Sequence, residues 1–451
     1  MSNPGEQDAT PIRSMADLSA NLAAGGKPRS HWRIGTEHEK FGFRRPDAGG
    51  HFEPIPYGPN GIGDLLAGIA PQGFEEIRDQ GALIGLKRGA ESISLEPGGQ
   101  FELSGGILAN LHETRAEFAA HFKTVLPVAG PMGIAFALLG FHPTARREDM
   151  PWMPKSRYAI MRRYMPLVGS MGLDMMLRTC TVQTNLDFEN EADMREKLRI
   201  SLLLQPVATA LFANSPFTEG KPNGFLSYRA QVWTDTDNQR SGIPALFLDD
   251  DFGFDKYVQW LLDVPMYFVS RNDTLIDVAG ASFRDFMAGR VDALKGIEPT
   301  IGDFTDHVTT VFTDVRIKRF LEMRGSDTGS VGMMLAQSAF WVGLLYDPAA
   351  QAAALSLVRE APWQDYAAMR GHVPREGMAA RAPQGSVRDL ARAAVAIAAD
   401  GLRARGLGEE VYLAPLFEIA AGGPTQAEHW LNRYEKVWGG DVSKVFIESA
   451  V

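Results

Sequence analysis

The chain holds a single cysteine, Cys180, among 451 residues. One thiol excludes an intrachain disulfide and a paired-cysteine zinc site, and it favours a reducing compartment. Basic residues are also few, because 45 Lys and Arg stand against 55 Asp and Glu, a net charge of −10 at pH 7. This balance argues against a nucleic-acid-binding protein, since phosphate backbones require a basic surface. A nucleotide substrate stays open, because bound metal ions reverse the local sign of a site.

Long apolar runs and targeting signals are missing as well. The most apolar window, residues 128–141, is too short and too broken by Gly and Pro to span a bilayer. Residues 1–20 lack the basic and then apolar pattern of a secretory signal, and they carry acidic residues that a transit peptide avoids. We therefore predict a cytoplasmic protein with no membrane segment and no nucleic-acid partner.

Two familiar site motifs are absent too. The sequence has no GxxxxGK[ST] phosphate loop and no HExxH zinc motif. A glycine-rich stretch at residues 58–68 follows no apolar strand and is interrupted by Pro59, which does not favour a dinucleotide-binding unit. Any nucleotide chemistry therefore requires another kind of site.

Periodicity predicts an α+β protein. Helical spacing occurs at residues 15–23, 111–129, 194–214, 334–347, 367–373 and 386–406. Alternation typical of strands occurs at residues 32–43, 92–104, 179–188, 266–271 and 316–325. Successive strands without intervening helices favour an antiparallel sheet with helices gathered on one side. We predict one catalytic domain, made of an N-terminal segment (1–30), a sheet-containing core (31–334) and a mainly helical C-terminal portion (335–451).

Pairs of acidic residues stand on the predicted strands. Glu37 and Glu39 are two residues apart, so a strand places both carboxylates on one face and His38 on the other. Glu96 and Glu102 flank a Pro-Gly-Gly turn and share the polar face of a hairpin. Either water solvates these faces, or a cation lies between the carboxylates.

Two further strands carry polar rows. Thr179, Thr181 and Gln183 alternate with Cys180, which we predict to be a packed thiol rather than a nucleophile. Glu322 and Arg324 place a carboxylate beside a guanidinium, a pairing that suits phosphoryl transfer. An exposed sheet face and a surface ion-pair network are the ordinary alternatives. Together, carboxylate-rich oxygen sites suit Mg²⁺ or Mn²⁺ rather than zinc, which points to an ATP-dependent reaction at two or three metal ions.

These motifs resemble the plant-type glutamate–cysteine ligases, also called γ-glutamylcysteine synthetases, which occur in plants and proteobacteria and are distantly related to glutamine synthetase. The resemblance covers about residues 30–345 and continues more weakly to the C-terminus. It is carried by the stretches IGTEHEKFGF, SISLEPGGQFELSG, MMLRTCTVQTNLDF, ALFANSPFTEGKPNGFLSYR, WTDTD, DVPMYF and VRIKRFLEMRGSD.

The resemblance implies a saddle-shaped antiparallel sheet flanked by helices. It further implies that ATP with Mg²⁺ phosphorylates the γ-carboxylate of L-glutamate and that the amine of L-cysteine then attacks, giving γ-glutamylcysteine, the first step of glutathione biosynthesis. The implied metal ligands are Glu37, Glu39, Glu96, Glu102 and Glu322. The implied catalytic residues are Arg324, Arg240 and Glu322, and the implied substrate-binding residues are Thr179, Thr181, Gln183, Arg229, Trp233 and Arg319.

Two alternatives remain at this stage. One is a related carboxylate–amine ligase that joins glutamate to a different amine, and the other is a catalytically silent nucleotide or amino-acid sensor. Plant members of the family use cysteine pairs for redox control, which one cysteine cannot provide. We expect a monomer or a weak homodimer.

Overall fold

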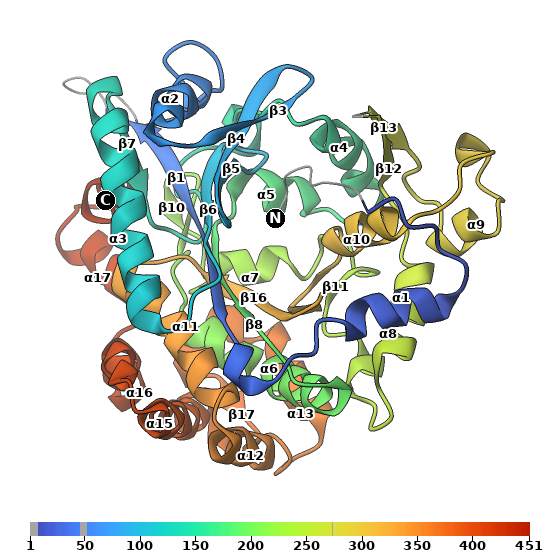
Figure 1. The fold of residues 1–451 in the computed structure, drawn as a ribbon. Helices are drawn as coiled ribbons and strands as arrows, with labels where there is room; N and C mark the ends of the chain where they lie inside the picture. The colour runs from blue at the N-terminus through green and yellow to red at the C-terminus, as the bar shows by residue number, and fades with distance from the viewer. Residues whose placement is uncertain (1–7, 46–51, 273) are drawn as a thin grey trace.

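A computed structural model describes residues 8–45, 52–272 and 274–451. The first seven residues of the predicted N-terminal segment lie outside these ranges. The structure is built on one antiparallel sheet of ten strands (Figure 1). These strands are β1 (Ile34–Arg44), β2 (Glu53–Pro54), β3 (Glu75–Asp79), β4 (Ala82–Arg88), β5 (Glu91–Leu95), β6 (Gln100–Ser104), β7 (Ile134–Ala137), β8 (Thr181–Leu186), β15 (Val315–Ile317) and β16 (Leu321–Asp327).

The strand order is β15-β16-β8-β1-β6-β5-β4-β3, and β2 and β7 pair with the far end of β1. Four of the five stretches predicted from alternation therefore lie in this sheet, whereas residues 266–271 contribute a strand to a separate pair. The remaining strands form two-stranded pairs: β9 (Phe217–Thr218) with β10 (Lys221–Pro222), β11 (Ser241–Gly242) with β14 (Phe312–Thr313), β12 (Phe268–Arg271) with β13 (Thr274–Asp277), and β17 (Arg381–Ala382) with β18 (Gly385–Ser386).

Helices surround the sheet and fill the C-terminal portion (Figure 1). In the first half of the chain they are α1 (Met15–Ala23), α2 (Ile62–Ile69), α3 (Leu111–Ala129), α4 (Ser156–Val168), α5 (Gly172–Arg178), α6 (Glu191–Leu211) and α7 (Tyr228–Val232). In the second half they are α8 (Phe254–Asp263), α9 (Phe283–Met287), α10 (Ile301–Thr309), α11 (Val331–Leu345), α12 (Pro348–Leu357), α13 (Trp363–Ala368), α14 (Val373–Glu376), α15 (Val387–Arg405), α16 (Ala414–Ala421), α17 (Gln426–Lys436) and α18 (Val445–Glu448).

One face of the central sheet is covered by helices. Helices α3 and α11 contact β1, α11 also contacts β8, and α6 contacts β16. The side chains on this face are buried, and Thr36 of β1 and Thr184 of β8 each lie 3.0 Å from the hydroxyl of Ser338 on α11. A cavity lies on the opposite face of the same strands. The predicted α+β architecture with helices against an antiparallel sheet is thereby confirmed.

Local signals explain where the longest helices begin and end. Asn110 caps α3 and Asn190 caps α6, each by accepting a backbone N–H three residues ahead. Helix α15 begins with a capping box at Ser386 and ends before Gly406, whose φ of 70° suits glycine. Sequence patterning located these helices because their caps and their apolar stripes agree.

Three predicted elements differ in the structure. Residues 316–325 form a hairpin of β15 and β16, with Ile317 opposite Leu321, rather than one strand. The strand predicted over residues 179–188 is limited to Thr181–Leu186, because helix α5 extends to Arg178. Residues 367–373 divide between α13, a 3₁₀ turn (Met369–Gly371) and α14.

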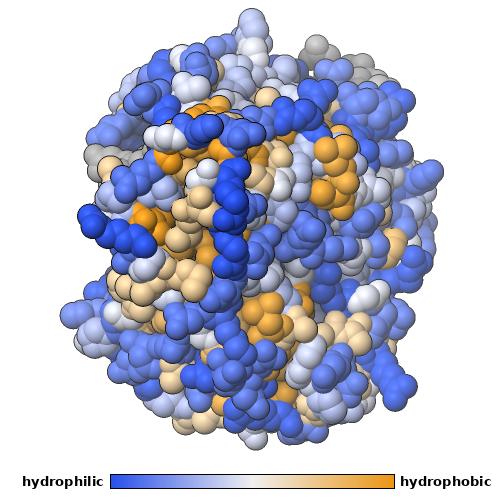
Figure 2. All heavy atoms as spheres, turned by 90° about the vertical axis from the view of Figure 1, so that its right-hand side faces the viewer, coloured by the Kyte–Doolittle hydropathy of each residue, from blue (hydrophilic) through white to orange (hydrophobic). Residues whose placement is uncertain are grey.

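The molecular surface carries no large apolar face in the view of Figure 2, where apolar patches are small and separated by hydrophilic side chains. Among the helices of the described ranges, none combines the length and the apolar character needed to cross a bilayer.

Candidate functional site

A cavity of about 790 Å³ opens on the uncovered face of the sheet. Most of the residues predicted for the site line it: Glu37, Glu39, Glu96, Glu102, Thr179, Thr181, Gln183, Arg229, Trp233 and Arg324. They come from β1, from the β5–β6 hairpin, from β8, from α7 and its end, and from β16. The residues that alternation placed on polar faces of separate strands therefore lie in one place.

Strand register explains how the carboxylates come together. Glu39 of β1 lies opposite Glu102 of β6, and Glu37 lies opposite Gln183 of β8. His38 points to the helix-covered face, where it packs edge-on against Phe118 of α3 at 4.9 Å between ring centroids. The period of two thus separates the two glutamates from the histidine between them, as predicted.

The carboxylates of Glu39 and Glu102 repel one another. Burial, together with Glu96 and Glu102, raises the pKa of Glu39 well above its usual range. Burial, Glu96 and Glu37 raise the pKa of Glu102 to about 7. The Thr181 N–H donates to Glu39 over 2.9 Å, and Glu102 accepts from Ser94 Oγ over 2.5 Å and from Ser104 Oγ over 3.2 Å. Arg229 acts on Glu39, and Lys155 acts on Glu96 and Glu102, but burial and the neighbouring carboxylates outweigh these cations.

Glu322 lies in the opposite electrostatic surroundings. Its fully buried carboxylate accepts from Arg316 at 2.6 Å, from Arg324 at 3.1 Å and from Lys318 at 3.2 Å. Burial raises the pKa of Glu322, but these three cations outweigh it and hold the pKa well below its usual range. In this arrangement the carboxylate of Glu322 neutralises three neighbouring cations.

Arg324 and Arg229 are fixed by polar bonds at the basic end of the cavity. Arg324 Nη1 donates to Gln183 Oε1 over 2.6 Å, and Arg229 Nη2 donates to the backbone oxygen of Arg324 over 2.9 Å. The hydroxyls of Thr179 and Thr181 donate to backbone oxygens. These threonines therefore shape the floor of the cavity, while Gln183 orients Arg324.

Three predicted residues do not line the cavity: Glu322, whose ion pairs are described above, Arg240 and Arg319. Arg240 is fully buried, bound to Asp237 at 2.6 Å and to the Pro265 oxygen at 2.6 Å, and stacked 4.0 Å from the ring centre of Tyr267. Its donors serve the packing of neighbouring loops. Arg319 is exposed at the β15–β16 turn and donates to the Asn21 oxygen over 3.1 Å, because the hairpin removes it from any strand face.

Other lining residues escaped the sequence-based reasoning. Arg157, in the first turn of α4, and Arg316 bring positive charge to the cavity, and Thr309 and Phe312 close its side. Acidic residues are preferred at a helix N-terminus, so the basic Arg157 in this position is a sequence signal that its side chain has another role. Arg316 lies opposite Glu322 in the β15–β16 hairpin and is its ion-pair partner, a pairing across strands that has no local sequence signal.

The oxygen donors of the cavity can be compared with those that a divalent cation requires. Within the described ranges, no three His, Cys, Asp or Glu side chains are gathered closely enough to hold a metal ion. The donors at the Glu39–Glu96–Glu102 corner nevertheless fit Mg²⁺, because they are carboxylate oxygens whose mutual repulsion a cation relieves. Glu322 does not fit, since three cations already surround it.

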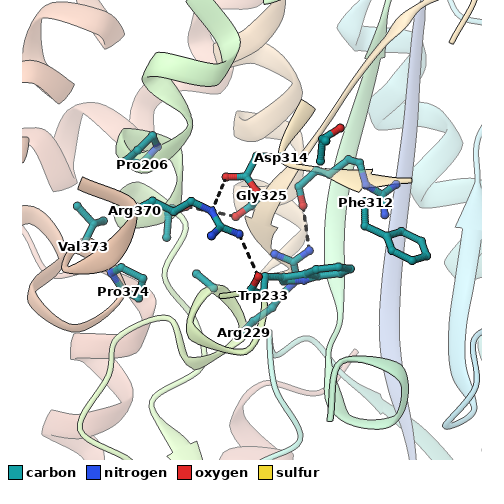
Figure 3. A pocket seen from close by; sticks show the side chains of 13 residues that line it. Pro206, Arg229, Trp233, Phe312, Asp314, Gly325, Arg370, Val373 and Pro374 are labelled. Carbon is teal, nitrogen blue, oxygen red and sulfur yellow. Dashed lines mark hydrogen bonds and ion pairs between the residues drawn. The ribbon is translucent and has the colours of Figure 1, made fainter. Parts of the chain in front are cut away.

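A second cavity, of about 490 Å³, adjoins the first (Figure 3). Arg229, Trp233, Phe312 and Arg324 line both cavities and form a shared wall. Beyond this wall the lining comes from α6, from β14 and from the C-terminal helical portion through Arg370, Val373 and Pro374.

Comparisons with known proteins identify relatives. The sequence model of glutamate–cysteine ligase family 2 (GCS2) matches residues 33–448. The chloroplastic glutamate–cysteine ligase of Nicotiana tabacum is 50% identical over 433 residues, covering 96% of this chain and 82% of the relative. That of Arabidopsis thaliana is 50% identical over 441 residues, covering 98% and 83%. The prediction of a cytoplasmic protein is contradicted by these relatives, whose names place them in the chloroplast.

A crystal structure of glutamate–cysteine ligase from Francisella tularensis, in complex with AMP, has the same fold. The TM-score is 0.55 at 12% sequence identity, and the match covers 93% of this chain and 87% of that one. At this identity the likeness concerns the fold alone.

Proposed function

Because the chain belongs to glutamate–cysteine ligase family 2, we infer that it is an ATP-dependent ligase that joins L-cysteine to the γ-carboxylate of L-glutamate. The products are γ-glutamylcysteine, ADP and phosphate, and the reaction is the first step of glutathione synthesis. The observation that carries this inference is 50% identity to glutamate–cysteine ligases over nearly the whole chain. The cavity on the sheet, acidic at one end and basic at the other, supports it.

The reaction proceeds in two steps. The γ-carboxylate of glutamate attacks the terminal phosphorus of ATP, which breaks the bond to ADP and gives an acyl phosphate. The neutral amine of cysteine then attacks the acyl carbon, loses a proton and expels phosphate. Both steps develop negative charge on phosphoryl oxygens, which fixed cations stabilise without reorganising. Arg324, held by Gln183, supplies such a charge at every working pH.

The acidic end of the cavity is the proposed Mg²⁺ site. Glu39, Glu96 and Glu102 hold the cation there, with Glu37 next to them on β1. When bound, Mg²⁺ neutralises the polyphosphate of ATP. Mn²⁺ shares the preference for oxygen ligands and is expected to substitute. The number of ions proposed is two or three.

Substrates are proposed to meet near Arg229 and Trp233. The cavity floor of Thr179, Thr181 and Gln183 faces glutamate, while Arg229 binds a carboxylate or a phosphoryl oxygen. Glu322 acts by fixing Arg316 and Arg324 rather than as a metal ligand. Glutamate, cysteine and ATP are the proposed partners, and the chain is proposed to act as a monomer or weak homodimer.

An ADP-release assay tests the activity. Purified protein should release ADP only when glutamate, cysteine, ATP and Mg²⁺ are all present, and EDTA should abolish release. Arg324→Lys should lower kcat by about 10²-fold or more, because it removes a positioned donor to the phosphoryl group. Arg319→Lys is the matched control and should leave kcat unchanged, since Arg319 is exposed outside the cavity. ADP release with another amine but not with cysteine would identify a ligase of different acceptor.

A further inference from the structure

The second cavity differs from the first in its charge. Its ionisable lining consists of Arg229, Arg324, Arg370 and a single carboxylate, Asp314. The balance is positive, whereas the first cavity is lined by four glutamates and four arginines. An anionic group is therefore attracted to the second cavity, and a cation is repelled from it.

Arg370 is held in place for a ligand. Its Nε donates to Asp314 over 3.0 Å and its Nη2 donates to the backbone oxygen of Trp233 over 3.1 Å, as Figure 3 shows. Gly242 packs flat against the guanidinium, because a Cβ there would lie 3.3 Å from Arg370 Cζ. These contacts fix the plane of the group, and a planar fork of fixed orientation is suited to a carboxylate.

The shared wall contributes two buried donors. Among the described residues, Arg229 Nε and Trp233 Nε1 have no hydrogen-bond partner. Arg229 is 3% exposed, so an unpaired donor on its guanidinium is costly. Both groups donate and neither accepts, which again requires an acceptor such as a carboxylate oxygen.

The rest of the lining mixes apolar and hydroxyl-bearing side chains. Pro206, Phe312, Val373 and Pro374 face the cavity together with Thr209 and Thr313. The cavity lies beyond Arg324 and away from the carboxylates proposed to hold Mg²⁺. Because Arg229 and Arg324 line both cavities, a carboxylate held in the second cavity lies next to the proposed phosphoryl-transfer site.

We propose that this second cavity binds the α-carboxylate of the acceptor amino acid, and that Arg370 selects acceptors that carry this carboxylate. The proposal rests on the ligase activity proposed above and names the part of the site that recognises the acceptor. It brings the helical C-terminal portion into substrate recognition. The class of ligand is an α-amino acid.

Cysteamine, which is cysteine without its carboxylate, tests the proposal. Wild type, Arg370→Gln and Arg370→Lys are compared with Arg375→Gln, a control on α14 that removes an exposed guanidinium outside both cavities. For Arg370→Gln, kcat/KM for cysteine should fall by about 10- to 100-fold, through KM for cysteine. The KM values for glutamate and ATP, and kcat/KM for cysteamine, should change less than threefold. Arg370→Lys should retain part of the kcat/KM for cysteine that Arg370→Gln loses, because lysine keeps the positive charge but not the planar pair of N–H donors.

The outcomes separate the two proposals. Equal losses with cysteine and cysteamine, or a raised KM for glutamate alone, would overturn the role of Arg370. Failure of the wild type to ligate cysteine would refute the proposed activity instead. The binding affinities of cysteine and cysteamine, measured by calorimetric titration, would then still test the carboxylate site. Wild type and Arg375→Gln should bind cysteine more tightly than cysteamine. Arg370→Gln should lose this preference.

Discussion

At the scale of single residues, glutamates of the same sheet lie in opposite electrostatic surroundings. Glu102 and Glu39 lie among other carboxylates and are held at raised pKa, while Glu322 lies among cations and is held ionised. Sequence spacing placed all three on polar faces but could not distinguish these surroundings. The difference arises from Arg316 and Lys318, which reach Glu322 only because the chain turns back between β15 and β16.

Removing the charge of Glu102 should stabilise the metal-free protein at alkaline pH. With its folded pKa at about 7 and an ordinary value of 4.5, the folded state binds a proton that the unfolded state releases between these values. Stability contributed by this group is therefore lost as the pH rises from about 4.5 to 7, by up to about 3 kcal/mol. Glu102→Gln in EDTA should raise Tm above wild type at pH 8 and match it near pH 5, while losing activity. A lower Tm at pH 8 would contradict the assigned repulsion.

Glu322→Gln should have the reverse effect on stability. The substitution leaves Arg316, Lys318 and Arg324 without their shared anion, and breaking a buried ion pair costs about 3–5 kcal/mol. We expect urea unfolding at pH 7.5 to show a loss of a few kcal/mol together with lower turnover. Glu39→Gln is the comparison, since it removes a repelled charge and should not destabilise the protein. Equal unfolding midpoints for Glu322→Gln and wild type would refute the ion-pair role.

At the scale of elements, the two hairpins of the site show that a turn can be predicted only where its residues are typical of turns. Pro97, Gly98 and Gly99 signalled the β5–β6 hairpin, and the structure confirms it, with Ser94 opposite Glu102. The β15–β16 turn is made of Lys318, Arg319 and Phe320, which carry no Gly, Pro, Asn or Asp. A continuous alternation was therefore taken for one strand, and Arg319 was placed in the site.

Gly98→Ala should disturb the acidic corner through the packing of the β5–β6 hairpin. A Cβ at Gly98 would lie 2.3 Å from the backbone oxygen of Leu177 at the end of α5, and Gln100 ties the same two elements together by donating to the Met176 and Thr179 oxygens. We expect a loss of about 1–3 kcal/mol in chemical unfolding and reduced affinity for Mg²⁺, because Glu96 moves with the turn.

The matched control for that variant is Gly332→Ala. Gly332 lies in α11 with nothing within 4 Å of an added Cβ, so the change should be neutral or should stabilise by up to about 1 kcal/mol. Unaltered stability and Mg²⁺ affinity in Gly98→Ala would show that the hairpin does not depend on its contact with α5.

At the scale of the whole molecule, the α+β class and the helical C-terminal portion were predictable because long periodic segments carry their own caps. That the C-terminal portion contributes to the second cavity was not predictable, because Arg370 lies in a short irregular region between α13 and α14. Pairing of strands distant in sequence also leaves no local signal. The single-domain division stays a prediction.

Activity and assembly should be indifferent to thiol redox state. The chain has one cysteine, and Cys180 is fully buried, with burial and Glu39 raising the pKa of its thiol well above the usual range. A low thiolate fraction and no access disfavour both disulfide formation and oxidation. Specific activity and sedimentation profile should be the same after treatment with a reductant or with oxidised dithiothreitol. A redox-dependent dimer would show that Cys180 becomes accessible in solution.

The wall shared by the two cavities links the occupancy of one to the occupancy of the other. Arg229 and Arg324 border both, so an anion on one side weakens the attraction that remains for an anion on the other. Such coupling is reciprocal: the factor by which bound nucleotide changes the acceptor's affinity equals the factor by which the acceptor changes the nucleotide's. Because Arg229 is buried, added salt screens this communication only weakly. The strength of this coupling is therefore set by the charges of the wall.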